Sequence, residues 1–122
     1  MKATEIMIGD RLAYKGQYAA FDFKVEQVTK HKVGYHAEPG ESRMHYIRLN
    51  ECNPIPLTPE ILERNKIRYQ FGMPWYQGGV NGVFEFRYRS DDDSTEVRKP
   101  VRYVHELQHI LKDCGIEKEV EI

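Results

Sequence analysis

Hydrophobic and polar residues alternate along several short stretches in the first half of the chain. Between residues 19 and 28, Phe21, Phe23 and Val25 occupy every second position, and charged residues fill the positions between them. A period of two is typical of a strand that buries one face. We therefore predict a strand over 19–28 whose three apolar side chains share one inward face.

Two more strands are predicted around the segment EPGES at residues 38–42. This segment has the composition of a turn, and it separates the apolar stretches 33–36 and 44–49. Several short strands at this spacing are typical of a small, strongly bent antiparallel sheet. The pattern predicts an SH3-like small β-barrel over residues 1–57.

The pattern changes after this predicted barrel. Thr58 can accept a backbone N–H at the start of a helix, and Pro59 fits the first helical turn because its missing N–H is not needed there. We predict a short helix over 59–65.

Alternation returns in the stretches 67–71 and 82–90, and TEVRKP at residues 95–100 is predicted as a further strand. Between the first two stretches lies MPWYQGGVNG, which is rich in turn-forming residues. We predict that this segment, residues 73–82, is a loop that carries the only Trp of the chain, Trp75.

The last long pattern is helical and covers residues 101–114, where apolar residues recur at intervals of three and four. Gly115 can take the left-handed conformation that ends a helix, and Ile116 can contact Leu111, as a Schellman ending requires. The final segment, EKEVEI, alternates and predicts a short edge strand.

Together these patterns predict an α+β protein with two lobes. Residues 1–57 form the barrel lobe, followed by a helix, an antiparallel sheet and a C-terminal helix over residues 58–122. The second lobe ends in the helix 101–114. We expect the two lobes to pack as one unit.

Composition and charge narrow the function classes. The chain of 122 residues is 40% hydrophobic and 30% charged, which is typical of a folded protein, and its net charge of −1 provides no global positive field for nucleic acid. It has no apolar run of about 18 residues and no secretory signal at its start. Cys52 and Cys114 stand apart and predict reduced, buried thiols. We expect a cytoplasmic protein that does not bind membranes.

One segment suggests a specific chemistry. HELQH at residues 105–109 matches the pattern H-E-x-x-H, in which two His one helical turn apart bind zinc and the Glu activates the metal-bound water. This match predicts, as an alternative function, a zinc-dependent hydrolase with His105 and His109 as metal ligands and Glu106 as the general base.

Two physical arguments count against the zinc alternative. A catalytic zinc needs a third ligand, yet Lys112 and Gly115 stand where one subclass carries its glycine and third His. On a helical wheel, His105 and His109 also lie opposite the apolar face, which predicts that both face solvent. The sequence leaves open that a histidine before the helix, His31, His36 or His45, is the third zinc ligand.

Three segments of the chain carry a resemblance: Ile8-Gly9-Asp10, PIPLTPEIL at residues 54–62 and YVHELQ at residues 103–108. They resemble a family of short uncharacterised proteins encoded by phages, prophages and mobile elements of Bacteroidetes-type bacteria. The resemblance covers nearly the whole chain in the same order. Family members often lack the acid after the first His and the second His, which implies that His109 was not placed by a zinc requirement. The resemblance implies an accessory factor and supplies no activity, ligand or mechanism.

Two other groups of residues are candidates for binding. Trp75 and Tyr76 in the predicted loop can form an exposed aromatic hot spot, or Trp75 can instead cover the core. Arg87 and Arg89 share one face of a predicted strand and can contact phosphate. Three more basic residues follow along the chain, Arg98, Lys99 and Arg102, and Tyr88 and Tyr103 can add stacking. The nearby Asp91, Asp92 and Asp93 partly cancel the positive charge.

We therefore predict a non-enzymatic binding or regulatory accessory protein of phage or mobile-element origin. It needs no cofactor, and its expected partner is another protein. The predicted binding residues are Trp75, Tyr76, Arg87 and Arg89. A nucleic-acid-binding module, with weak and salt-sensitive binding, is the second alternative beside the zinc hydrolase.

Overall fold

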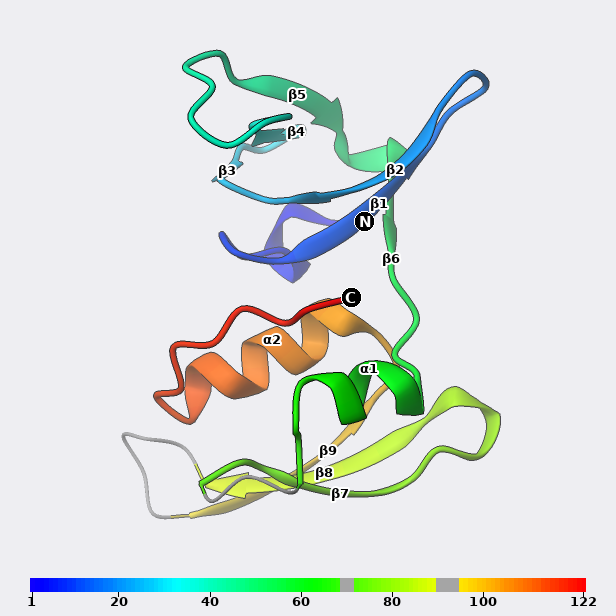
Figure 1. Ribbon diagram of the computed structural model, residues 1–122, viewed down its shortest axis with the longest axis vertical. Helices are drawn as coiled ribbons and strands as arrows, with labels where there is room; N and C mark the ends of the chain where they lie inside the picture. The colour runs from blue at the N-terminus through cyan, green and yellow to red at the C-terminus, as the bar shows by residue number, and fades with distance from the viewer. Residues whose placement is uncertain (69–71, 90–94) are drawn as a thin grey trace. The chain divides into compact units, whose positions relative to one another are not determined.

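A computed structural model describes residues 1–68, 72–89 and 95–122 of the chain. The chain divides into two compact units, Met1–Ile55 and Pro56–Ile122. Both contain antiparallel strands, and the second also contains the helices α1 and α2 (Figure 1). The predicted α+β class is thus confirmed.

Six short strands form the first unit. They make two three-stranded antiparallel sheets with the strand orders β2-β1-β6 and β3-β4-β5. The strands predicted at 33–36 and 44–49 are confirmed as β4 and β5, which pair with Val33 opposite Ile47. The elements in chain order are η1 (Ala3–Glu5), β1 (Arg11–Lys15), β2 (Ala20–Lys24), β3 (Gln27–Val28), β4 (Lys32–Tyr35), β5 (His45–Arg48), η2 (Leu49–Glu51) and β6 (Cys52–Pro54).

The predicted β-barrel is not closed, and the SH3-like fold is not confirmed. The strand predicted over 19–28 is divided into β2 and β3, because the chain passes from one sheet to the other at Val25 and Glu26. The N–H of Val25 donates to the carbonyl of Asp10 and that of Glu26 to the carbonyl of Gly34, each over 2.8 Å. A barrel needs one continuous ladder around its circumference, whereas these strands pair within two separate sheets.

The predicted inward face of the first strands is confirmed for two of its three members. Phe23 and Val25 are 4% and 0% exposed, but Phe21 is 37% exposed. Phe21 pairs with Tyr14, closer to the hairpin turn, where the core no longer covers the strand. The buried cluster of this unit consists of Ile6, Leu12, Phe23, Val25, Val33, Ile47, Leu49 and Cys52.

A three-stranded antiparallel sheet, in the order β7-β8-β9, forms the base of the second unit. Helices α1 and α2 lie on the same side of this sheet (Figure 1). The predicted helix start is confirmed, because the N–H of Ile61 donates to Thr58 Oγ1 over 3.3 Å. The elements are α1 (Pro59–Arg64), β7 (Trp75–Gly78), η3 (Val80–Gly82), β8 (Phe84–Arg89), β9 (Glu96–Val101) and α2 (Val104–Asp113).

Two predictions around the sheet are wrong. Trp75–Gly78 is not a loop but the strand β7, which pairs with β8. Ile67 and Arg68, predicted to begin a strand, lie in a turn instead, and Arg68 has a positive φ of 80° that no strand residue adopts. The rest of that predicted strand, 69–71, lies outside the described residues.

The C-terminal end of α2 is confirmed in detail. Gly115 has a φ of +74°, the N–H of Ile116 donates to the carbonyl of Leu111 over 2.8 Å, and the N–H of Gly115 donates to that of Lys112 over 3.0 Å. These are the two hydrogen bonds of a Schellman motif. The helix starts later than predicted, at Val104, because β9 continues to Val101.

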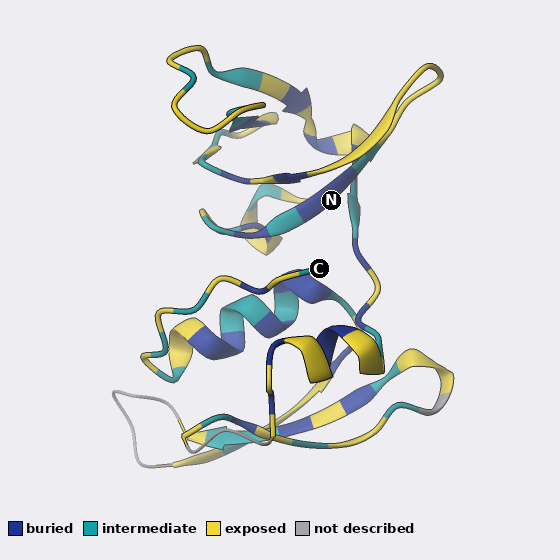
Figure 2. Cartoon of the chain, viewed as in Figure 1, coloured by how far each residue is buried: buried dark blue, intermediate teal, exposed yellow. Residues whose placement is uncertain are grey.

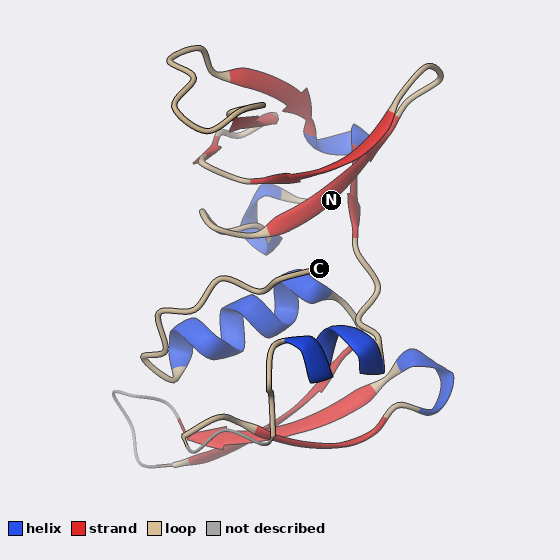
Figure 3. Ribbon diagram, viewed as in Figure 1, coloured by secondary structure: helices blue, strands red, loops and turns tan. Residues whose placement is uncertain are grey.

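The segment after α2 is not the predicted edge strand (Figure 3). Instead, two side-chain amides hold it. Gln108 donates to the carbonyl of Lys118 over 2.7 Å and accepts from the N–H of Val120 over 2.9 Å. Asn65 makes the same pair of bonds with the backbone of Glu121, both 2.8 Å long. Each side-chain amide thus gives the backbone of the tail the donor and the acceptor that a neighbouring strand would otherwise supply.

Both cysteines are free thiols, as predicted. Cys52 is buried, and its burial raises the pKa of the thiol. Cys114 is half-buried, so the prediction of burial holds only for the first. None of the helices in the described parts of the chain has the length and apolar character to cross a membrane.

Candidate binding surfaces

The side chains of β8 alternate between two chemically different faces of its sheet. Phe84 and Phe86 are 2% and 0% exposed and lie on the face that the helices cover. Glu85 and Arg87 alternate with them and therefore lie on the opposite face. Figure 2 shows the alternation of buried and less buried positions along β8. The register places Trp75 of β7 beside Arg87, so Trp75 belongs to this opposite face as well. It is named the outer face below.

Trp75 is the large apolar residue of the outer face and is 61% exposed. Of the two possibilities raised by the sequence, the exposed one is therefore observed. The guanidinium of Arg68 lies 5.2 Å from the centroid of the Trp75 ring, within the range of a cation–π contact. The prediction missed Arg68, because its segment was interpreted as a strand and no local signal marks the turn.

Tyr76 does not share the surface of Trp75, although the two were predicted as one hot spot. It lies on the covered face, with its ring centroid 5.8 Å from that of Phe84 and 5.5 Å from that of Phe86. At the edge of β7, Arg68 also reaches within 5.3 Å of the Tyr76 ring. Tyr76 thus packs beneath the strand, whereas Trp75 is exposed on the outer face.

Three arginines extend the outer face beyond Trp75. Arg87 lies opposite Arg98, and Arg89 lies opposite Glu96. Like charges directly opposite each other are unfavourable on a sheet, so the Arg87 and Arg98 pair favours an added negative charge. Arg87 Nε is buried and has no hydrogen-bond acceptor among the described residues. The two predicted arginines, Arg87 and Arg89, are thus brought together with Trp75.

A shallow cavity of about 390 Å³ lies around Trp75 and Arg87. It is lined by Trp75, Tyr76, Gln77, Glu85, Arg87 and Glu96. An indole ring, a guanidinium and an amide in one hollow can hold a side chain of a partner by stacking and hydrogen bonds.

The two tyrosines predicted to help at this face lie elsewhere. Tyr88 pairs with Val97 on the covered face, and its pKa is raised, mainly by burial and then by the negative charge of Asp113. Tyr103 stacks on His105, with ring centroids 5.8 Å apart and ring planes at 13°. The predicted stacking role of both residues at the arginine face is wrong.

The two histidines of the HELQH segment do not both face solvent. His105 is 6% exposed, and His109 is half-buried. Their ring centroids lie 5.7 Å apart, nearly perpendicular, and the His105 ring is also covered by Tyr103. The helical wheel represents only the positions within a helix, so it could not show that Tyr103, which precedes α2, covers His105.

Glu106 has a structural role at the start of α2. Its Oε1 accepts from the N–H of Arg102 over 3.0 Å and from that of Tyr103 over 3.1 Å, as the acid of a capping box does. The general-base role in the zinc alternative would require this cap to open. Within residues 1–68, 72–89 and 95–122, no group of three or more His, Cys, Asp or Glu side chains is arranged to hold a metal.

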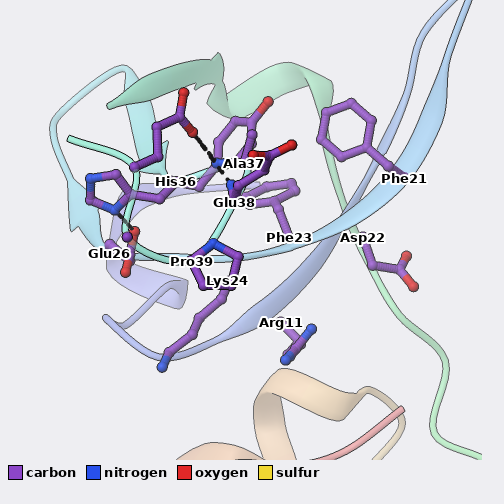
Figure 4. Close-up of a pocket in the computed structure, with 13 residues that line it drawn as sticks. Arg11, Phe21, Asp22, Phe23, Lys24, Glu26, His36, Ala37, Glu38 and Pro39 are labelled. Atoms are coloured by element: carbon purple, nitrogen blue, oxygen red, sulfur yellow. Dashed lines mark hydrogen bonds and ion pairs between the residues drawn. The ribbon is translucent and has the colours of Figure 1, made fainter. Parts of the chain in front are cut away.

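The first unit contains a larger pocket, of about 820 Å³, on the side of β2 and the 38–42 turn (Figure 4). Three aromatic rings line it, from Phe21, Phe23 and Tyr35. The ring centroids of Phe21 and Phe23 lie 5.7 Å and 5.1 Å from that of Tyr35, so the rings form one continuous apolar surface. It is named the aromatic pocket below.

Charged side chains surround these rings. They come from Arg11, Asp22, Lys24, Glu26, Glu38 and Glu41. Burial raises the pKa of the Tyr35 hydroxyl, and the Glu41 carboxylate raises it further. No residue of this pocket was predicted as a binding residue, although the shared face of Phe21 and Phe23 was recognised.

Glu41 organises the turn that forms one wall of the aromatic pocket. Its Oε2 accepts from the N–H groups of Ala37 over 3.0 Å and Glu38 over 3.4 Å, and its Oε1 lies 3.0 Å from His45 Nε2. The hydrogen bond with His45 lowers the pKa of Glu41. Glu26 pairs with His36 in a similar way across the next part of the wall.

No family model matches the chain, and neither the curated proteins nor the solved structures give a match. The resemblance to mobile-element proteins therefore stays a prediction.

Proposed function

We propose that this protein is a non-enzymatic binding protein that engages an acidic segment of a partner protein through its outer face. The observation that carries the proposal is Trp75, a large apolar side chain that is 61% exposed between Arg68 and Arg87. Trp and Arg are the residues that contribute most to binding energy in protein interfaces.

The contact between Arg68 and Trp75 favours binding because it orders both side chains in advance. A stacked guanidinium loses less conformational freedom when a partner arrives, so more of the contact energy contributes to affinity. The strand beneath them is anchored by Tyr76 on the covered face. The surface is therefore held on a rigid element.

The charges of the outer face favour an acidic partner. Arg87, Arg89 and Arg98 outnumber Glu85 and Glu96 among its described residues. A carboxylate of the partner can relieve the repulsion between the opposed Arg87 and Arg98, and it can form a two-point hydrogen bond with a guanidinium. The accessory role in a phage or mobile element rests on the resemblance of residues 54–62 and 103–108.

The test uses the fluorescence of Trp75, which is the only Trp and therefore reports on the outer face alone. We expect a Glu- and Asp-rich peptide to shift the emission of Trp75 to shorter wavelength in a saturable titration. Arg87→Gln should weaken binding by roughly tenfold, as loss of a charge-assisted contact does. The matched control Arg64→Gln, an exposed arginine of α1, should leave affinity unchanged.

A peptide that leaves the emission of Trp75 unchanged at millimolar concentration would contradict the proposal. Equal effects of Arg87→Gln and Arg64→Gln would also contradict it, since the binding would then depend only on net charge.

Single-stranded nucleic acid is the second candidate, favoured by the same exposed Trp75 beside arginines. A base can stack on the indole while the guanidinium groups contact phosphates. A thymidine oligomer of the same charge as the acidic peptide separates the two. If the oligomer binds much more tightly, and Trp75→Ala removes this advantage, nucleic acid replaces protein as the preferred partner. Affinity for the oligomer should fall steeply with salt.

A further inference from the structure

The aromatic pocket of the first unit is independent of the outer face, and its chemistry differs. Of the two Phe residues that line it, Phe23 is 4% exposed and Phe21 is 37% exposed. The ring of Tyr14 continues the aromatic surface, with its centroid 5.2 Å from that of Phe21. Such a surface accepts an apolar chain or the face of a cation.

The charges around the pocket decide between these two occupants. Four carboxylates line the pocket, from Asp22, Glu26, Glu38 and Glu41, against the two cations of Arg11 and Lys24. If His36, which also lines the pocket, is counted as neutral, these side chains carry two more negative than positive charges. An anionic or purely apolar occupant would leave this excess uncompensated, whereas a cation would neutralise it.

The arrangement of the charges also favours a cation at the rings. In Figure 4, Glu38, Phe21 and Phe23 lie at one end of the pocket, and the amino group of Lys24 points to the other end. The Glu38 carboxylate makes no hydrogen bond or ion pair with other described residues, unlike Glu26 and Glu41. A carboxylate without a partner beside aromatic rings is the combination that binds an alkylammonium group.

The same unit already contains one such contact. Lys32 Nζ lies 4.5 Å from the centroid of the Tyr46 ring, outside the aromatic pocket. The ammonium group thus lies over an aromatic face at a distance typical of a cation–π contact.

We propose that the aromatic pocket binds a lysine side chain, methylated or not, from a basic segment of a partner protein. Phe21, Phe23 and Tyr35 contact the ammonium group and its stem, and Glu38 neutralises the charge. The inference does not depend on the function proposed for the outer face, which lies in the other unit and favours an acidic segment.

The experiment titrates the full chain into fluorescein-labelled peptides and measures their anisotropy. The peptides are Gly- and Ser-rich octamers that differ only in two positions, which carry lysine, trimethyl-lysine, acetyl-lysine or norleucine. We expect the two cationic peptides to bind and the two neutral ones to bind at least about tenfold more weakly. This comparison uses the wild-type protein and does not depend on whether a variant folds.

Variants then locate the site. Phe21→Ala should weaken binding of the lysine peptide by roughly tenfold, and Glu38→Gln should weaken it by about three- to tenfold. Tyr46→Ala is the matched aromatic control, since the Tyr46 ring lies outside the pocket and faces Lys32, and Glu51→Gln is the matched charge control. Both controls should retain wild-type affinity, and so should Trp75→Ala.

Four results would overturn the proposal. One is equal binding of the lysine and acetyl-lysine peptides, and another is unchanged affinity in a folded Phe21→Ala protein, checked by circular dichroism. The third is absence of binding by both cationic peptides at millimolar concentration. Loss of lysine binding in Trp75→Ala would move the site to the outer face and would likewise reject the aromatic pocket.

Discussion

The two units combine aromatic rings with charge in opposite ways. In the first unit, a turn folds against a sheet and encloses three rings among an excess of carboxylates. In the second unit, one indole stands on an open sheet face among an excess of arginines. From this difference we predict that the sign of the surrounding charge, together with the depth of the surface, selects the partner more than the rings do.

The largest expected effects are on the free energy of unfolding, and they distinguish the buried from the exposed aromatic residue in each unit. Phe23→Ala and Phe86→Ala should each lower the free energy of unfolding by about 3–5 kcal/mol, because each opens a cavity in a packed core. Phe21→Ala and Trp75→Ala should lower it by less than about 1 kcal/mol. Urea unfolding of the four variants provides the measurement.

The comparison fails if Phe21→Ala or Trp75→Ala unfolds the protein. Those rings would then belong to the cores, and neither would be available to a partner. Phe23→Asp should be worse than Phe23→Ala, since it places a charge among the apolar side chains of the first unit.

The next largest effect concerns the amide that holds the C-terminal tail of the second unit. Asn65→Ala should cost about 1–3 kcal/mol, because the backbone N–H and carbonyl of Glu121 lose their partners near the core. The outer face lies on the other side of the sheet, so binding of the acidic peptide should survive. Amide hydrogen exchange at Glu121 should become faster in the variant, and unchanged exchange would contradict the tether.

A smaller effect tests whether the second unit is a binding or a catalytic one. Glu106→Ala should cost about 1 kcal/mol by removing the cap of α2, while Glu106→Gln, which still offers an acceptor, should cost less. Excess zinc should leave the melting temperature of the wild type unchanged, whereas a native site would raise it by mass action.

Stoichiometric zinc in protein purified without a chelator, lost on replacing His105 and His109, would reverse this expectation. Glu106 would then regain the general-base role, and the comparison between two binding surfaces would no longer describe the second unit.

The smallest effect is a dependence on pH confined to the aromatic pocket. Hydrogen bonding to His45 lowers the pKa of Glu41 below its ordinary value of 4.5. The stabilisation from Glu41 is therefore complete above that value and is lost as the pH falls through the lower, folded pKa. Nuclear magnetic resonance should show the N–H signals of Ala37 and Glu38 moving in this acid range.

Glu41→Gln should remove this transition and leave signals of the outer face unaffected. A transition that persists in Glu41→Gln would assign the effect to another carboxylate of the pocket.

Local patterns predicted the elements whose stabilising contacts are close in sequence. Thr58 begins α1 through a bond to Ile61, three residues later, and Gly115 ends α2 through bonds within five residues. The alternation predicted in 82–90 is likewise observed in β8, where Phe84 and Phe86 are buried. In these cases the deciding hydrogen bonds and the repeat lie within one segment.

Contacts between distant segments decided the rest. Trp75–Gly78 is a strand only because β8 pairs with it, and this register unites Trp75 with Arg87. Tyr103 covers His105, which the periodicity of α2 had placed in solvent. In the aromatic pocket, Phe21 and Tyr35 meet because β2 and β4 approach each other in space.

The sequence by itself therefore determined the α+β class, both helices, most strands and three residues of the outer face, Trp75, Arg87 and Arg89. The tertiary structure alone decided the two open sheets in place of a barrel, the aromatic pocket and the separation of Tyr76 from Trp75. The physical reason is that strand pairing and side-chain clustering gain their energy from partners far along the chain. Propensity and periodicity describe only the segment in which a residue stands.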